Sequence, residues 1–264
     1  MFFEKISRFW GYPLKKKIDV IFIKMTSLIF FLPAIYMRNY LLSYLPDSFV
    51  SQKYTYHTEL YNKFRKDNKI NNGGDIHRLN SFILNIEYLM SEKNIPGDFA
   101  ELGVWKGNTS QILAYFAKKY DKHCYLFDTF KGFDKRDLIN FDSQFQVAQF
   151  SNTSIDIVKE CIGDEYLSNC TFVTGYFPNS ITEDLYSKRY SVVSIDADLY
   201  EPTKAALKYF YPLTNDGGIF LLHDYSSLIW QGCKKAIDEF CDRENQQIVL
   251  MPDKSGSAFI RIRK

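Results

Sequence analysis

The chain alternates between two hydrophobic patterns from about residue 76 onward. Apolar residues spaced three and four apart, such as Ile76, Leu79 and Ile83, predict helices, whereas short continuous apolar runs predict buried strands. In chain order the pattern predicts a helix from about 76 to 90, strands at 99–102, 124–127, 170–173, 191–195 and 219–222, helices around 112–116, 155–161, 202–211 and 233–240, and strands at 248–251 and 258–262. Such alternation of strands and helices predicts an α/β fold with a doubly wound parallel sheet.

The last two predicted strands are joined by a short turn, Pro252-Asp253-Lys254-Ser255-Gly256. Strands joined by so short a turn pair antiparallel, because a parallel connection needs a longer crossover. We therefore expect a Rossmann-like, mostly parallel, seven-stranded sheet that ends in a C-terminal antiparallel hairpin.

A glycine-containing turn follows the first predicted strand. Glu101 ends the strand, Gly103 and Gly107 follow, and Asn108-Thr109-Ser110 opens a helix. A strand, glycine turn and helix in this order form a unit that holds nucleoside-bearing cofactors. The leading acid would repel a pyrophosphate but suits a cofactor with a cationic amino-acid end, so the motif indicates S-adenosylmethionine (SAM) rather than NAD. The terminal hairpin also favours the class I SAM methyltransferase version of the fold over the dehydrogenase version.

The second predicted strand stops at Asp128. An acid in this register with the glycine turn is placed to accept hydrogen bonds from ribose hydroxyls. The alternative is that Asp128 only begins the turn Thr129-Phe130-Lys131-Gly132. We expect it to bind the cofactor.

Two further predicted strands end in Asp196-Ala197-Asp198 and in His223-Asp224. In an extended segment Asp196 and Asp198 would point to the same side. Carboxylates and an imidazole at neighbouring strand ends suit a divalent cation such as Mg²⁺ or Mn²⁺. The alternative is that Asp198 and Asp224 cap the helices that follow them. For His223, metal ligation, general-base action and a hydrogen bond to a ligand all stay open.

Taken together, these motifs resemble those of the TylF-type macrocin O-methyltransferases, from about Asp75 to the C-terminus. The resemblance is carried by Glu101-Leu102-Gly103-Val104-Trp105-Lys106-Gly107, Asp128-Thr129-Phe130-Lys131-Gly132, Asp196-Ala197-Asp198-Leu199-Tyr200-Glu201-Pro202-Thr203 and Asp224-Tyr225. It implies a SAM- and Mg²⁺-dependent enzyme that methylates sugar hydroxyls.

The resemblance also implies roles for individual residues. Cofactor-binding positions fall on Glu101, Gly103, Trp105, Gly107, Asp128 and Thr129, metal ligands on Asp196, His223 and Asp224, and the general base on Asp198. His223 stands where the family typically has a second aspartate, which favours Mn²⁺ or another softer ion.

Composition narrows the class of partner. The 264-residue chain has a formal net charge of +2, and Lys15-Lys16-Lys17 is its largest basic run, so we expect no nucleic-acid binding. The five cysteines include no Cys-x-x-Cys pair and stand among apolar residues, which favours reduced thiols and a cytoplasmic protein.

Residues 1–72 differ from the rest and are expected to form an N-terminal helical extension ahead of a methyltransferase domain at 73–264. Residues 25–37 are uncharged and largely apolar, but the run is shorter than the roughly 20 residues of a membrane span. One interpretation is an interfacial helix at the inner face of the membrane, with Lys15, Lys16, Lys17, Lys24 and Arg38 toward anionic headgroups. The other is a helix that packs on the main domain, as an acceptor lid, or on a second subunit of a homo-oligomer.

The sequence therefore predicts an enzyme that methylates a sugar hydroxyl in a glycoside or in a precursor of a bacterial surface polysaccharide. One alternative is a catechol-type O-methyltransferase acting on another small molecule. A second is a non-catalytic module with this fold in a polysaccharide assembly complex.

Overall fold

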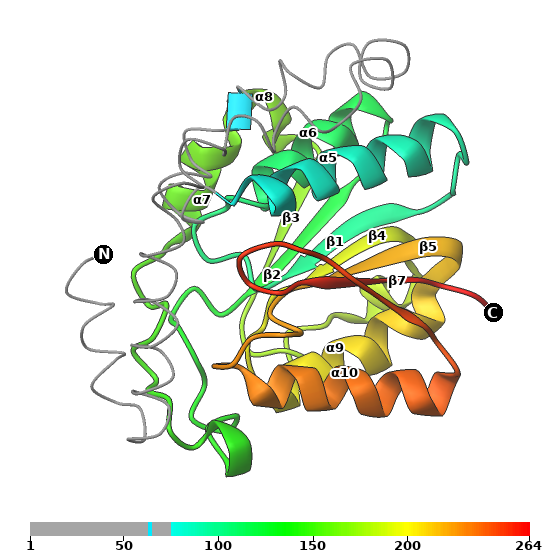
Figure 1. Ribbon diagram of the computed structural model, residues 1–264. Helices are drawn as coiled ribbons and strands as arrows, with labels where there is room; N and C mark the ends of the chain where they lie inside the picture. The colour runs from blue at the N-terminus through cyan, green and yellow to red at the C-terminus, as the bar shows by residue number, and fades with distance from the viewer. Residues whose placement is uncertain (1–62, 65–74) are drawn as a thin grey trace, which may run out of the picture. The chain divides into compact units, whose positions relative to one another are not determined.

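In the computed structural model, which describes residues 63–64 and 75–264, strands and helices alternate along the chain (Figure 1). The strands are β1 (Asp98–Leu102), β2 (Cys124–Asp128), β3 (Cys170–Thr174), β4 (Tyr190–Ile195), β5 (Thr214–Leu222), β6 (Ile248–Leu250) and β7 (Ala258–Arg261). The helices are α5 (Ile76–Ser91), α6 (Ser110–Lys119), α7 (Ile155–Ile162), α8 (Asp164–Leu167), α9 (Tyr200–Leu213) and α10 (Gln231–Glu244), with short 3₁₀ turns η1 (Asn140–Asp142) and η2 (Glu183–Ser187). The predicted N-terminal extension and its boundary lie outside the described residues.

All seven strands form one sheet in the order β3-β2-β1-β4-β5-β7-β6. Neighbours from β3 to β5 are parallel, and β7 runs antiparallel to both β5 and β6. The predicted mostly parallel sheet with a C-terminal antiparallel hairpin is confirmed.

Helices cover both faces of the sheet, α5 and α6 on one side and α9 and α10 on the other (Figure 1). Local signals fix several of their ends. Asp75 caps α5 by accepting a hydrogen bond from the Arg78 N–H at 3.1 Å, and Ser154 caps α7 at the Ile157 N–H. Asn245 ends α10 in the left-handed conformation that favours asparagine and glycine.

The core lies along the central strands. Every residue of β4 is buried, as a strand flanked on both edges and covered on both faces requires. Phe127 of β2 packs edge-on against Phe177 and Phe210, which brings the loop after β3 and helix α9 onto the same face.

Several boundaries differ from the predicted ones, and two of the differences have a local reason. Strand β5 begins at Thr214 rather than 219, because pairing with Tyr190 of β4 extends it over five residues, Thr214-Asn215-Asp216-Gly217-Gly218, none of which is apolar. Helix α9 begins at Tyr200, which places Pro202 in its first turn, where the missing proline N–H breaks no helical hydrogen bond.

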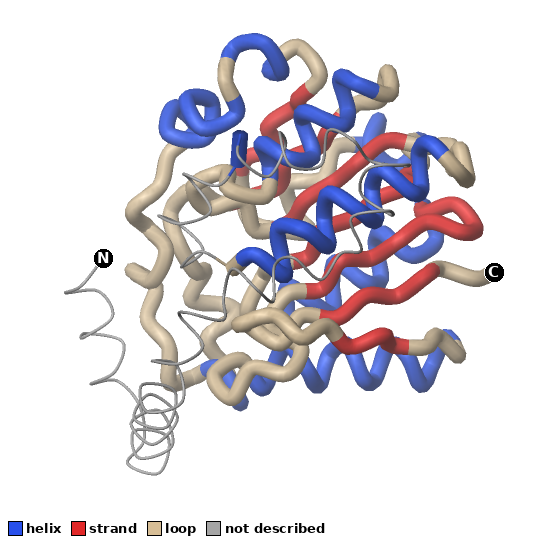
Figure 2. Tube along the Cα trace, turned by 45° about the horizontal axis from the view of Figure 1, so that its top comes forward, coloured by secondary structure: helices blue, strands red, loops and turns tan. Residues whose placement is uncertain are grey.

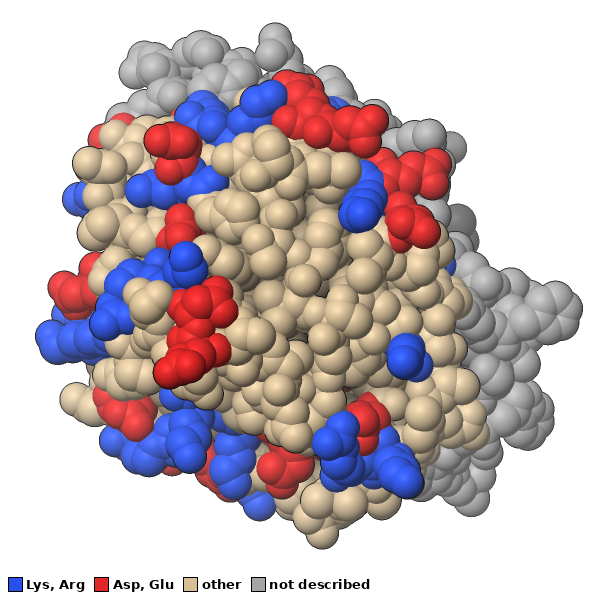
Figure 3. Space-filling view, turned by 180° about the vertical axis from the view of Figure 1, so that it is seen from behind, with Lys and Arg blue, Asp and Glu red and all other residues tan. Residues whose placement is uncertain are grey.

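Within the described residues, no helix is both long and apolar enough to cross a membrane. On the face shown in Figure 3, basic and acidic side chains are interspersed around a broad area without charged residues. The five cysteines carry free thiols; Cys161 and Cys170 are half-buried and the other three are buried.

Candidate functional site

The strands lie side by side in one sheet (Figure 2), and the carboxyl ends of the parallel strands β1, β2, β4 and β5 lie at the same edge of it. Leu102 of β1 is in register with Phe127 of β2 and Ile195 of β4, and Ile195 is in register with Leu222 of β5. The next residue of each strand is therefore held level with its neighbours. Backbone hydrogen bonds join Gly103 N to Phe127 O (3.0 Å), Asp196 N to Leu102 O (2.8 Å) and His223 N to Ile195 O (3.0 Å).

The turn after β1 needs glycine at Gly103. Its φ is +90°, and a Cβ there would lie 2.0 Å from the carbonyl oxygen of Asp196. Gly107 has φ +80° and allows close approach of α7, since a Cβ would lie 3.0 Å from Val158 Cγ1. Both predicted glycines therefore shape the loop, and any cofactor contact would be made by the backbone beside them.

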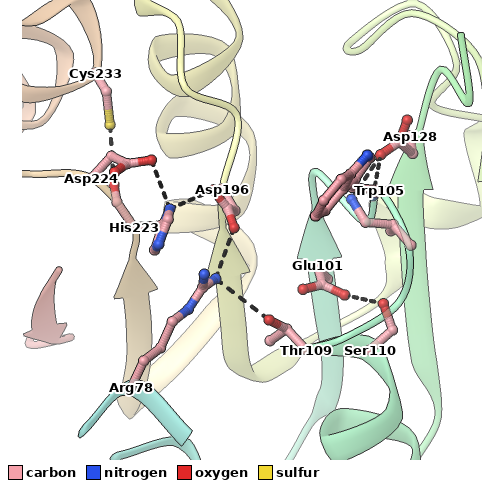
Figure 4. Close-up of polar contacts among 11 residues, drawn as sticks. Arg78, Glu101, Trp105, Thr109, Ser110, Asp128, Asp196, His223, Asp224 and Cys233 are labelled. Carbon is pink, nitrogen blue, oxygen red and sulfur yellow. Dashed lines mark hydrogen bonds and ion pairs between the residues drawn. The ribbon is translucent and has the colours of Figure 1, made fainter. Parts of the chain in front are cut away.

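The Asp128 carboxylate organises this loop (Figure 4). Its Oδ2 accepts hydrogen bonds from the N–H groups of Val104 (2.8 Å) and Trp105 (2.9 Å), and its Oδ1 accepts from Phe130 N–H (2.7 Å). Burial raises the pKa of Asp128 above its usual value, although these N–H groups act in the opposite direction. Asp128 thus begins the following turn and also fixes the glycine loop, while its ribose contact stays a prediction.

Two other predicted cofactor residues lie on the same loops. Trp105 has φ +46°, and its indole Nε1 donates to Asn152 Oδ1 at 2.9 Å. The Thr129 hydroxyl donates to the Gly132 carbonyl at 2.7 Å within its own turn. Both side chains are therefore engaged by the loops that border the edge of the sheet.

Glu101 is buried within β1 and accepts a hydrogen bond from the Ser110 hydroxyl at the start of α6 (Figure 4). Burial raises the pKa of Glu101 to about 8, chiefly because desolvation penalises the charged carboxylate. A cationic group beside it would favour the ionised form. A contact between Glu101 and the cofactor ammonium stays a prediction.

We expect the Glu101→Gln variant to be more stable than the wild type at about pH 8 but not at about pH 5. The folded chain keeps a proton on Glu101 up to a pKa of about 8, whereas an exposed glutamate loses it near about pH 4.3. The wild type is therefore most stable below about pH 4.3, the pKa of an exposed glutamate. Between that pH and the pKa of folded Glu101, its free energy of unfolding falls by at most about 1.4 kcal/mol per pH unit. Thermal unfolding of the cofactor-free protein at both pH values measures the difference.

The exposed Glu160→Gln variant is the matched control, because its side chain lies on the outer face of α7. Equal stability changes for the two variants at both pH values would contradict a raised pKa for Glu101.

At the ends of β4 and β5, Asp196, His223 and Asp224 converge as predicted (Figure 4). His223 Nδ1 lies 2.8 Å from Asp196 Oδ1 and 2.7 Å from Asp224 Oδ2. One potential ligand atom from each residue lies within 4.8 Å of the others. His223 Nε2 is buried and has no hydrogen-bond partner among the described residues. Two carboxylates with an imidazole nitrogen, Nδ1, between them are donors that a divalent cation accepts, and the nitrogen donor favours Mn²⁺ over Mg²⁺.

Arg78 is a member of this cluster that the sequence analysis missed. It comes from α5, its side chain is 7% exposed, and its Nη2 lies 2.7 Å from Asp196 Oδ2. The same nitrogen donates to Thr109 Oγ1 at 3.4 Å, at the start of α6. Its position in the sequence gave no signal, because its partner lies 118 residues away.

The cluster balances buried charges against one another. Burial would raise the pKa of Asp196, but His223 and Arg78 outweigh it and hold the pKa below the usual range. Burial and Arg78 act to lower the pKa of His223, yet Asp196 and Asp224 raise it to about 10. The two carboxylates therefore favour the protonated imidazole, so a cation that binds through this nitrogen has to displace its proton.

Asp198 lies near the carboxylates of this cluster, but its backbone conformation differs from the predicted one. The expectation of an extended Asp196–Asp198 segment was wrong, because Asp198 has φ +60° and turns the chain into α9. Neither Asp198 nor Asp224 stands at the N-cap of the next helix, because that position is Leu199 in α9 and Trp230 in α10. Burial, followed by the Asp224 and Asp196 carboxylates, raises the pKa of Asp198 well above its usual range.

The sequence and the fold are both similar to those of known methyltransferases. The family model described as macrocin-O-methyltransferase (TylF) matches residues 74–259. A mycinamicin III 3''-O-methyltransferase from Micromonospora griseorubida is 27% identical over 178 residues, which cover 63% of this chain and 68% of that protein. A demethyldecarbamoylnovobiocin O-methyltransferase from Streptomyces niveus is 26% identical over 160 residues, which cover 56% of this chain and 59% of that protein.

Solved structures share the fold. The O-methyltransferase NovP superposes with a TM-score of 0.63 at 22% identity and covers 72% of this chain and 81% of its own. The calicheamicin methyltransferase CalS11 gives a TM-score of 0.57 at 21% identity and covers 77% of this chain and 91% of its own. Both are class I methyltransferases in fold, as predicted for this sheet.

Proposed function

Because the chain belongs to the macrocin-O-methyltransferase (TylF) family, we propose that it transfers a methyl group from SAM to a sugar hydroxyl with the help of a divalent cation. The acceptor is a glycoside or a sugar-containing precursor of a bacterial surface polysaccharide. Two relatives support the glycoside class, because they are named as a mycinamicin III 3''-O-methyltransferase and a demethyldecarbamoylnovobiocin O-methyltransferase.

The observation that carries this proposal is the meeting of two sets of residues at one edge of the sheet. One set, at the ends of β1 and β2, consists of the glycine loop, Glu101 and Asp128. The other, the acidic cluster of Asp196, His223 and Asp224, lies at the ends of β4 and β5, and β4 is the neighbour of β1. A methyl donor held by the first set would face an acceptor held at the second. This arrangement serves methyl transfer from a nucleoside cofactor to an oxygen.

In the proposed enzyme, Glu101 receives the cofactor ammonium and Asp128 holds the ribose. The glycine loop lets the backbone approach the cofactor, and Asp128 keeps that loop in shape through its bonds to Val104 N–H and Trp105 N–H. Positioning the donor in this way supplies much of the rate in a direct transfer between two bound groups.

Asp196, His223 and Asp224 would hold the divalent cation. When bound, such a cation supplies Lewis acidity that makes a coordinated hydroxyl more acidic. Arg78 keeps Asp196 ionised and oriented through the 2.7 Å contact with its Oδ2. His223 stands where the family typically has an aspartate, so this site has one carboxylate fewer and one nitrogen donor more.

Asp198 is the proposed general base. It lies among the carboxylates of the cluster, and burial with their charges makes it a stronger proton acceptor than an exposed aspartate. It would take the proton of the acceptor hydroxyl as the oxygen bonds to the methyl group, and the sulfonium sulfur would keep the electron pair of the broken bond.

We expect purified protein to bind S-adenosylhomocysteine (SAH) with micromolar affinity by calorimetry and to methylate members of a glycoside panel. Radiolabelled SAM with parallel glycoside and catechol panels measures the acceptor class, and chelation with EDTA followed by Mn²⁺ or Mg²⁺ addition measures the metal requirement. Methylation of catechols alone would favour the catechol-type alternative. SAH binding without transfer to any acceptor would favour a non-catalytic module.

A further inference from the structure

Asp142 is a buried residue of the segment between β2 and α7, and none of the roles described above uses it. This β2–α7 segment (residues 129–154) contains η1, and the Asp142 side chain at the end of η1 is 1% exposed. A carboxylate so deeply buried needs donors around it, because burial of an unpaired charge is costly. Its surroundings therefore indicate what it does.

The Asp142 carboxylate lies at the first turn of α9. Its Oδ2 accepts a hydrogen bond from Tyr200 N–H at 2.7 Å, across 58 positions of sequence. The N-cap residue of α9 itself, Leu199, supplies no side-chain cap. Asp142 thus performs for α9 the task that a local serine or aspartate performs at other helices, and its charge suits the positive end of the helix dipole.

The same carboxylate lies against the first turn of α10. A Cβ added to Gly232 would lie 2.5 Å from Asp142 Oδ2 and 2.7 Å from Oδ1, so only glycine admits the carboxylate there. Nearby, the ring centroid of Phe145 lies 4.4 Å from that of Trp230, the N-cap residue of α10. The segment is therefore joined to the starts of both helices.

Helix α9 follows the loop that carries Asp198, and helix α10 follows the loop that begins at Asp224. Asp198 precedes Tyr200 by two residues and turns into α9 at φ +60°, and the loop from Asp224 leads to α10. A carboxylate that fixes the first turn of α9 consequently fixes the backbone that aims Asp198.

We propose that Asp142 is a positioning residue that holds Asp198 in its reactive orientation. It also anchors the β2–α7 segment beside the carboxyl ends of β4 and β5. This inference rests on the proposed function, in which Asp198 is the base. Asp142 itself touches the starts of α9 and α10 rather than Asp198 or the glycine loop, so its effect on turnover would pass through the helix starts.

We expect Asp142→Ala to lower kcat about 100-fold, the scale that a misplacement of about 1 Å produces, while the dissociation constant of SAH stays within about twofold. Asp142→Asn keeps an oxygen that accepts from Tyr200 N–H, and it should recover most of the lost kcat. Trypsin should cleave Asp142→Ala faster than wild type after Lys131, Lys135 or Arg136, which all lie in the β2–α7 segment. Steady-state kinetics, SAH calorimetry and timed proteolysis measure these effects.

Ser154→Ala is the matched control, because it removes the cap of α7 at the end of the same segment without touching α9 or α10. It should lower stability to a similar degree and leave kcat near the wild-type value. If Asp142→Ala folds poorly, Gly232→Ala gives the same test, since its Cβ would push the Asp142 carboxylate away. Combining Gly232→Ala with Asp142→Ala should then add little further loss of kcat, because the two changes disturb one contact.

An active wild type whose Asp142→Ala variant keeps kcat within about threefold would overturn this inference and leave the proposed function intact. Equal losses of kcat and SAH affinity would also overturn it, because they would show a general loss of structure. A folded wild type that methylates nothing would instead be a failure of the proposed function.

Discussion

We expect the Asp198→Asn variant to turn over at least about 100-fold more slowly than the wild type while binding SAH with near wild-type affinity. Asparagine has nearly the same shape as aspartate but cannot take a proton from the acceptor hydroxyl. The raised pKa of Asp198, caused by burial and by the Asp224 and Asp196 carboxylates, makes the wild-type residue a good acceptor for that proton. Initial rates at saturating SAM, with SAH calorimetry in parallel, measure the effect.

The melting temperature of Asp198→Asn provides a second test, independent of turnover. Asp198 is a buried acid beside two other carboxylates, which makes its ionisation costly, so a neutral asparagine should leave the melting temperature unchanged or raise it. The control Asp216→Asn changes an exposed aspartate near the amino end of β5, at the opposite edge of the sheet, and should leave turnover unaffected. Turnover of Asp198→Asn within a few-fold of wild type would remove Asp198 as the base.

The sheet was predictable from sequence because each strand is either a continuous apolar run or the partner in a short hairpin. Strands buried on both faces, such as β4, read as uninterrupted apolar segments. The amino end of β5 was not recognised, since Gly217 and Gly218 lower the apolar signal where the strand passes a register shift. Propensity describes such a position poorly, because pairing with β4 decides the outcome.

The predicted site residues followed from topology rather than from any single motif. Parallel strands in register bring Gly103, Asp128, Asp196 and His223 to one edge, so an acid after an apolar run carried information about its neighbours. The local geometry did not follow in the same way. Asp198 turns away from the extended path at φ +60°, a choice imposed by the connection into α9.

Arg78 and Asp142 were not predictable from sequence because their partners are distant in the chain. Arg78 meets Asp196 across 118 positions, and Asp142 meets Tyr200 across 58. Neither belongs to a local pattern, and each looks in isolation like an ordinary charged residue of a helix or a loop. Burial identifies both, since charged side chains with so little exposure occur mainly where they are paired.

We expect Gly103→Ala to have the largest effect on the fold and the site together. A Cβ at this position would lie 2.0 Å from the carbonyl oxygen of Asp196 and 2.6 Å from its carbonyl carbon, both backbone atoms that cannot rotate away. Strands β1 and β4 would have to separate where Asp196 N bonds Leu102 O. The loss should be about 3 kcal/mol or more of unfolding free energy, with SAH binding abolished. Urea unfolding and SAH calorimetry measure the two effects.

Gly163→Ala separates steric conflict from backbone conformation. Gly163 has φ +83°, close to the +90° of Gly103, but nothing lies within 4 Å of the position its Cβ would take. It should therefore lose only the cost of an alanine at positive φ, about 1–2 kcal/mol, and should keep SAH affinity. Equal losses for the two variants would mean that conformation alone accounts for Gly103. A larger loss for Gly103→Ala, accompanied by displacement of Asp196, would show that the glycine loop and the acidic cluster depend on one backbone contact between β1 and β4.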